Sequence, residues 1–274
     1  MTIKLYYWGG YNNFGDELSP YIIRRMTGQQ VCKASESDDK PLVAIGSILD
    51  NSLLTRRATI WGSGTLARKK LLPPPLFPIN KYINYAFSIV RAKILALRGP
   101  LTRDLLVKRG CACNAIYGDP AILLPKFYQP RELTRRFKIG LILHQKNNVK
   151  LDDKIMIDHS VLNISIYRSS DYEIESMIDD ILCCDRIFSS SLHGLIVAQA
   201  YGIPAQWIKI TGQKIHDDED FKFYDYFLGA NQEIQKPVTL DCNDALATIK
   251  FLNKVDIAKC KPMTTSGLLG SFEI

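Results

Sequence analysis

Short hydrophobic runs alternate with helical patterns along the chain, which predicts repeated α/β units around largely parallel sheets. In the first half we expect strands at Ile3–Trp8, Leu42–Ile45, Thr59–Trp61, Lys93–Leu97 and Ala115–Tyr117. In the second half we expect them at Lys138–Leu143, Val161–Ile166, Arg186–Ser189 and Ala205–Ile208. The first-half runs end at a glycine, a polar turn or a helical segment, and open α/β sheets bind ligands at such strand ends.

Helical patterns follow several of these runs. Asp171–Cys183 has apolar residues at helical spacing and an N-cap in Ser170 or Asp171. Leu195–Tyr201 predicts a second helix, which ends at the glycine that follows it. We also expect a C-terminal helix at Asp241–Lys254 and a loosely held tail after it, at Met263–Ile274.

A change in pattern near the middle of the chain predicts two domains. Prolines and a charged stretch interrupt regular structure over Pro125–Arg136. We therefore expect a Rossmann-like domain over residues 1–130, a second over 131–240, and a C-terminal helix and tail over 241–274. Two similar α/β halves facing a cleft are the layout of a glycosyltransferase-B-like protein.

Composition narrows the class of protein. The chain has 274 residues, of which 46% are hydrophobic and 23% charged, as is ordinary for a globular protein. No apolar run approaches the roughly 20 residues needed to span a bilayer. Met1–Trp8 lacks the features of a signal peptide, so we expect a cytoplasmic protein. Cys111-x-Cys113 and Cys183-Cys184 have no zinc-site spacing, and we expect neither a metal site nor a disulfide framework.

The net charge of +7 favours anionic partners. Because the basic residues are dispersed and no nucleic-acid motif accompanies them, we do not expect nucleic acid to be the partner. Phosphorylated small molecules and an anionic membrane surface both fit the charge. The prolines over residues 73–78, beside Arg68–Lys70, indicate either a rigid surface loop or one that faces a membrane or an acceptor.

The segment Ser189–Gly194 is the strongest candidate for a site, because it joins a predicted strand to a predicted helix. Backbone N–H groups at a helix N-terminus attract anions. His193 is placed to bind phosphate or carboxylate or to donate a proton. The alternative is a capping serine and a core histidine, and the strand–loop–helix context favours a site. We therefore expect ligand contacts from Ser190, Ser191, Leu192, His193 and Gly194.

Other strand ends offer further candidates. Arg98 can clamp a phosphate or carboxylate, or it can be an exposed arginine paired with Asp104. Asn13 and Asp16 can bind sugar hydroxyls, although Asp16 can also cap the following helix. Similar sugar-binding or plain turn roles are open to Gly64 and Asp119, and His144 is a further candidate at a strand end.

The motifs together resemble the polysaccharide pyruvyl transferase family. They are Asn-Phe-Gly-Asp at 13–16, Leu-Arg-Gly-Pro-Leu-Thr-Arg at 97–103, Tyr-Gly-Asp-Pro at 117–120, Ser-Ser-Ser-Leu-His-Gly at 189–194 and Ala-Tyr-Gly-Ile-Pro at 200–204. The resemblance runs in order from about residue 5 to residue 228. The segment Phe221–Phe227 also looks like the subgroup that acts on bacterial exopolysaccharides.

This resemblance implies phosphoenolpyruvate as donor and a sugar diol of a surface-polysaccharide or capsule precursor as acceptor. The product would be a cyclic pyruvate ketal, and no other cofactor is implied. Arg98 and His193 match the donor-binding positions of the family. Ser191 stands where some relatives carry arginine, and Lys209, Lys146 or backbone amides are candidates to replace that charge.

The donor chemistry suggests roles for these residues. Phosphoenolpyruvate needs cations at its phosphate and its carboxylate. We assign Arg98 as the anion clamp and His193 as anion ligand and general acid, with Asp16 or Asp225 as the base. We expect an oligosaccharide acceptor carried on a lipid, which would bring the protein to the cytoplasmic face of the membrane. The alternatives are a nucleotide-sugar-dependent glycosyltransferase and a non-catalytic carbohydrate-binding relative.

Overall fold

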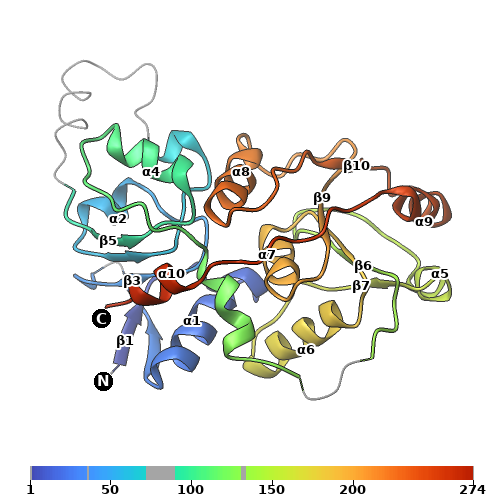
Figure 1. Cartoon of the computed structure of the whole chain (residues 1–274), viewed down its shortest axis with the longest axis horizontal. Coiled ribbons are helices and arrows are strands. Elements are labelled where there is room, and N and C mark those ends of the chain that lie inside the picture. The colour runs from blue at the N-terminus through green and yellow to red at the C-terminus, as the bar shows by residue number, and fades with distance from the viewer. Residues whose placement is uncertain (1, 36, 72–89, 131–133, 274) are drawn as a thin grey trace.

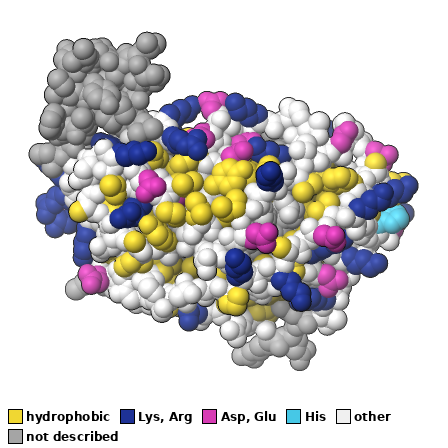
Figure 2. All heavy atoms as spheres, turned by 45° about the horizontal axis from the view of Figure 1, so that its top comes forward, with side chains coloured by type: hydrophobic (Ala, Val, Ile, Leu, Met, Phe, Trp, Pro, Cys, Tyr) yellow, Lys and Arg dark blue, Asp and Glu magenta, His cyan; other side chains and the backbone are white. Residues whose placement is uncertain are grey.

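The computed structural model describes residues 2–35, 37–71, 90–130 and 134–273. The proline-rich stretch at 73–78, for which we expected a surface, membrane-facing or acceptor-facing loop, lies outside the described residues. Among the residues that are described, no helix is long and apolar enough to cross a membrane. On the face drawn in Figure 2, lysine and arginine side chains are spread among acidic ones and do not form a single patch.

Two parallel five-stranded sheets form the framework (Figure 1). The first contains β1 (Thr2–Leu5), β2 (Gln30–Lys33), β3 (Leu42–Val43), β4 (Thr59–Trp61) and β5 (Lys93–Ala96), in the order β2-β1-β3-β4-β5. The second contains β6 (Ile139–Ile142), β7 (Val161–Asn163), β8 (Ile187–Ser189), β9 (Ala205–Ile210) and β10 (Val238–Leu240), in the order β10-β9-β8-β6-β7. Counted from its β7 edge, the second sheet repeats the order of the first. The chain is therefore a mixed α/β protein with two halves of like topology.

The hydrophobic runs predicted the central strands well, because a parallel strand covered on both faces is apolar throughout. Every residue of β6 and of β8 is buried. The edge strands β2 and β10 were missed, since they are short and partly exposed. The strand expected at Ala115–Tyr117 is wrong: only an isolated bridge joins Tyr117 to Leu97.

The helices begin where capping side chains allow. Ser170 caps α6 (Asp171–Leu182), as predicted, by accepting a hydrogen bond from the N–H of Glu173. Asp244 caps α9 (Ala245–Lys254), which therefore starts later than expected. The remaining helices are α1 (Phe14–Thr27), α2 (Asn51–Thr55), η1 (Arg68–Lys70), α4 (Pro100–Val107), η2 (Pro120–Lys126), α5 (Asp153–Asp158), α7 (Leu192–Ala200), α8 (Glu219–Gly229) and α10 (Ser266–Gly270).

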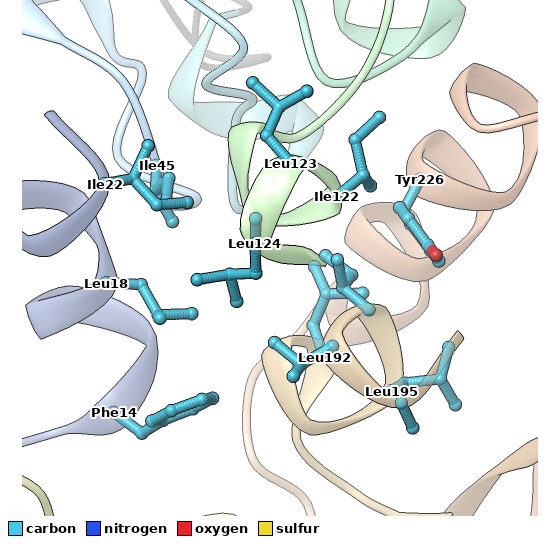
Figure 3. Packing of buried hydrophobic residues seen from close by; sticks show 14 of the residues in the cluster. Phe14, Leu18, Ile22, Ile45, Ile122, Leu123, Leu124, Leu192, Leu195 and Tyr226 are labelled. Atoms are coloured by element: carbon cyan, nitrogen blue, oxygen red, sulfur yellow. The ribbon is translucent and has the colours of Figure 1, made fainter. Parts of the chain in front are cut away.

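One hydrophobic core joins the two halves. The short helix η2 lies between α1 and α7, with Leu124 directed toward Leu18 of α1 and Leu192 of α7 (Figure 3). The same buried cluster includes residues of both sheets. The strands of each sheet fall within one of the two expected domains, and the exact limits at residues 130 and 240 stay predictions. Helices α1 and α7, which carry the motifs of interest, are thus packed together at the centre.

The C-terminal segment is not the loose tail that we expected. In Figure 1 it runs from α9, at one end of the molecule, back to α10 beside the first sheet. The indole N–H of Trp61 donates a 3.0 Å hydrogen bond to the carbonyl of Leu268. The ring of Phe272 packs edge-on against Trp61, with centroids 4.5 Å apart. Burial of these apolar groups, invisible to local sequence patterns, corrects the prediction.

Candidate active site

The main cavity lies at the carboxyl ends of the strands, where the chain connections of each sheet diverge in opposite directions. In each sheet the connections diverge between two neighbouring strands, β1 and β3 in the first and β6 and β8 in the second, and such switch points leave a crevice at the carboxyl ends. A cavity of about 630 Å³ is lined mainly by residues that follow these four strands, within 6–16, 47–50, 144–146 and 191–193; Leu66, Lys70, Tyr167, His216 and Lys222 complete its walls. Its size is within the roughly 300–1,000 Å³ of ligand pockets. Two switch points therefore build one site.

His193 enters this cavity from the first turn of α7. The Ser189 hydroxyl shapes the preceding turn by bonding the N–H and the carbonyl of Ser191, at 3.1 and 2.8 Å. The Nε2 atom of His193 lies 3.6 Å from the fully buried Oδ2 of Asp119, and neither atom has a hydrogen-bond partner among the described residues. The structure thus unites two residues that the sequence predicted separately.

The Asn-Phe-Gly-Asp motif brings α1 against this histidine. A Cβ on Gly15 would lie 2.1 Å from Nδ1 of His193, so only glycine permits the contact. Asn13 caps α1 by accepting from the N–H of Gly15 at 3.0 Å, and its amide donates to Oε1 of Gln145 at 3.2 Å. The capping role considered for Asp16 therefore belongs to Asn13.

Asp16 faces the cavity from the first turn of α1. Burial raises the pKa of its carboxyl group to about 6, and the neighbouring His193 opposes this rise. The carboxylate is therefore ionised at neutral pH but is more basic than an exposed aspartate. A general base with a pKa near the working pH is efficient, because it combines the right protonation state with proton affinity.

Lys222 is the main feature that the sequence analysis missed. It lies on α8, lines the cavity and is only 6% exposed. Its ammonium group has no hydrogen bond or ion pair within the described parts of the chain. Burial, and then the charge of Arg98, lower its pKa to about 8. The spacing of Lys222, Asp225 and Tyr226 on one helical face was the signal available, because all three are buried.

Two further histidines complete the polar wall. Burial is the largest cause that lowers the pKa of His144 to about 3 and that of His216 to about 4, and Lys222 contributes to both. Both imidazoles are therefore neutral at pH 7. Together with Lys146, which also lines it, they offer hydrogen bonds and charge to an anion.

Arg98 and Asp225 occupy a different place from the one expected. Both are fully buried, and they form an ion pair with a 3.0 Å separation. The other guanidinium contacts are the Ser47 hydroxyl at 2.5 Å and the Thr65 carbonyl at 2.8 Å. Asp225 also accepts from the N–H and the hydroxyl of Thr102, at 2.9 and 2.7 Å. Neither residue lines the cavity, which corrects the clamp role of Arg98 and the base role of Asp225; Arg98 reaches the cavity only through Ser47.

Comparisons with known proteins place the chain in a family. The family model for polysaccharide pyruvyl transferase matches residues 54–210, more than half of the chain. The chain belongs to this family. It is also similar to the uncharacterized protein L143 of Acanthamoeba polyphaga mimivirus, with 34% identity over 234 residues, which cover 82% of this chain and 73% of that protein. No solved structure matches.

The stretch that matches the pyruvyl transferase family contains His193 and Asp119, whereas Asp16 and Lys222 lie outside it. Lys209 is inside it, but its ammonium group already pairs with Glu219 at 3.1 Å and Asp220 at 2.6 Å. Lys209 does not line the large cavity, and its role in replacing the charge missing at Ser191 stays a prediction. Lys146, the other candidate, does line it.

The remaining predicted residues shape the site without facing it. Gly64 makes room for Arg98, since a Cβ there would lie 2.5 Å from the guanidinium carbon. Gly194 lets α7 approach Ser189 in the same way. The Ser190 hydroxyl accepts from the N–H of His144 at 2.9 Å and donates to Asn147 at 2.7 Å, so it holds the loop after β6. These three residues therefore have structural roles, and their expected ligand contacts stay predictions. In the described part of the chain, no group of three potential metal ligands occurs.

Proposed function

We propose that this protein transfers the pyruvyl group of phosphoenolpyruvate to a sugar diol of a surface-polysaccharide precursor, forming a cyclic ketal and releasing phosphate. The observation that supports it most is the ammonium group of the buried residue Lys222, which lines the cavity of a pyruvyl transferase family member and has no hydrogen bond or ion pair among the described residues. A buried charge without a partner is costly unless a ligand neutralises it. Phosphoenolpyruvate brings both a phosphate and a carboxylate.

The donor anion is proposed to bind between Lys222 and the start of α7. The first N–H groups of α7 have no acceptor within the helix, and the helix dipole favours an anion there. Lys146 adds a second cation from the loop after β6. Ser191 carries no charge at the position where some relatives have arginine. In this chain Lys222, on the neighbouring helix α8, supplies that positive charge instead. The two halves have the same strand order, which supports a glycosyltransferase-B-like arrangement with the site between them.

The proposed reaction uses His193 as acid and Asp16 as base. His193, whose Nε2 atom lies 3.6 Å from Asp119, gives a proton to C3 of the donor, which makes C2 electrophilic. Asp16 accepts the proton of the first sugar hydroxyl as that oxygen bonds to C2. The C2–phosphate bond then breaks and the second hydroxyl closes the ring, returning its proton to His193. The proton on Asp16 leaves with the phosphate, so both groups regain their starting states and no further cofactor is needed.

A binding experiment on Lys222 tests the donor site. Phosphoenolpyruvate should raise the unfolding temperature of the wild type, and nucleotide sugars should not. At 100 times the dissociation constant the donor should add roughly 2.7 kcal/mol to the free energy of unfolding. Lys222→Met should lose this response. It should also unfold at a higher temperature without ligand, because the pKa near 8, lowered from 10.5, corresponds to a burial cost of about 3 kcal/mol. That cost is present below pH 8, where the ammonium is charged in both states but buried only in the folded one.

Lys250→Met is the matched control for this experiment. Lys250 is exposed on α9, and its replacement should change neither unfolding nor the donor response. A wild type that responds to nucleotide sugars alone would indicate a glycosyltransferase. Donor binding without phosphate release, across a broad panel of glycan acceptors, would indicate a carbohydrate-binding relative.

A further inference from the structure

Three exposed aromatic side chains line the cavity in addition to its cations. Trp8 is 56% exposed, Tyr11 is 61% exposed and Tyr167 is 55% exposed. Large aromatic rings are usually well buried, and their gathering in one concave site indicates a binding surface. Nothing in the chemistry of phosphoenolpyruvate, a small dianion or trianion, calls for three aromatic rings.

The backbone beneath these rings is held by contacts between the two halves. Asn13 and Tyr167 form an antiparallel bridge, and the N–H of Phe14 donates to the carbonyl of Ile166 at 2.8 Å. The N–H of Arg168 donates to the carbonyl of Asn12 at 2.6 Å. The loop after β1 and the segment after β7 are therefore joined, so the rings are exposed on an ordered backbone.

The Trp8 loop has an anchor of its own. Lys33 donates to the carbonyl of Gly9 at 3.2 Å and places its ammonium group 5.6 Å from the ring centroid of Tyr7. Tyr7 and Gly9 flank Trp8 in the chain. Trp8 is thus exposed while the residues on both sides of it contact Lys33.

The aromatic and the cationic groups of the cavity come from different elements, and a hydrogen bond between Asn13 and Gln145 connects two of these elements. The aromatic rings follow β1 and β7, whereas the cations and histidines come from η1, from the loops after β6 and β9, and from α7 and α8. The bond between Asn13 and Gln145 joins the first group to the second, since Gln145 lies between His144 and Lys146. Asp16, the proposed base, is three residues beyond Asn13 and interacts electrostatically with His193 and Lys222.

We propose that Trp8, Tyr11 and Tyr167 form the acceptor subsite and bind the C–H face of a pyranose ring. The indole and phenol rings cover the apolar face of the sugar, and the phenol hydroxyls bond to its edge. The sugar then presents its diol toward Asp16. This assignment rests on the proposed function, and it makes the acceptor a hexopyranose unit of a glycan.

Acrylamide quenching of tryptophan fluorescence tests sugar binding directly. The chain has three tryptophans, and Trp61 and Trp207 are buried, so quenching reports on Trp8. A panel of methyl hexopyranosides should protect Trp8 from acrylamide, and phosphoenolpyruvate alone should not. Tyr167→Ala should raise the sugar concentration needed for half-maximal protection at least tenfold. Tyr172→Ala, at an 80% exposed position outside the cavity, should leave it unchanged.

A kinetic comparison separates this inference from the proposed function. Trp8→Ala should raise the acceptor KM at least tenfold and leave the donor dissociation constant within twofold, and Trp8→Phe should restore most of the acceptor affinity. Unchanged acceptor KM in Trp8→Ala and Tyr167→Ala would overturn the subsite. If Tyr167→Ala loses protection by sugar but the wild type does not bind phosphoenolpyruvate, the subsite stands and the proposed pyruvyl transfer is contradicted. Protection of Trp8 by nucleotides alone would overturn the sugar assignment.

Discussion

At the scale of single residues, the cavity places a cation and a carboxylate of unusual proton affinity close together. Lys222 has a pKa near 8 and Asp16 a pKa near 6, and burial is the first cause of both shifts. Burial disfavours the charged form, which lowers the pKa of a lysine and raises that of an aspartate. Perturbed groups of this kind in a cavity are typical of a functional site.

These two groups predict a bell-shaped pH profile. We expect kcat/KM to rise as Asp16 loses its proton near pH 6 and to fall as Lys222 loses its proton near pH 8, because the base must be ionised and the anion ligand charged. The affinity for phosphoenolpyruvate, measured by calorimetry, should weaken through the same alkaline limb. In Lys222→Met, the residual affinity should be independent of pH on that side. Affinity that stays constant in the wild type through pH 8 would contradict the role of Lys222.

At the scale of elements, two helix contacts decide how the site is assembled. Helix α8 is held by Asp225 through Arg98 and Thr102, and Gly99 permits close approach, since a Cβ there would lie 1.8 Å from the Asp225 carbonyl. This seat turns Lys222 toward the cavity. Helix α1 approaches His193 of α7 in a similar way through Gly15.

Gly15→Ala tests the second contact. The added methyl group must displace the His193 ring, so turnover should fall about 100-fold or more through loss of a placed acid. Overpacking should also cost about 1–3 kcal/mol of unfolding free energy, measured with urea. The stability cost should disappear in the His193→Ala background, because the clash partner is then absent. Gly267→Ala, where a Cβ meets nothing within 4 Å, is the control. A Gly15→Ala variant with normal turnover would rule out the close contact.

At the scale of the whole molecule, the two halves depend on each other. The core around η2 contains residues of both sheets, and the C-terminal segment returns to the first sheet after the second is complete. The cavity walls likewise come from both halves. We infer that the site and the joint core form together.

The return of the C-terminal segment gives a prediction about stability. Leu268 is 1% exposed, so Leu268→Ala should lower the free energy of unfolding by about 2–5 kcal/mol. Leu246→Ala, at an exposed position of α9, should change it by less than about 0.5 kcal/mol. Urea unfolding followed by fluorescence measures both. Equal, small effects would mean that the tail contributes little to the fold.

The sequence by itself determined the features that rest on local patterns. Hydrophobic runs located the buried strands, and the strand–turn–helix context placed His193 at the start of a helix. The order of short motifs identified the family. These features could be predicted because periodicity, capping and turn chemistry act over a few residues.

Only the tertiary structure decided which side chains face the cavity. Arg98 and Asp225 form an ion pair in the interior, while Lys222, on the same helix as Asp225, lines the cavity. Asp119 and His193 meet although they are far apart in the chain, and Leu268 closes over Trp61. Such pairings depend on burial and on the distance between remote segments, and the local sequence carries neither quantity.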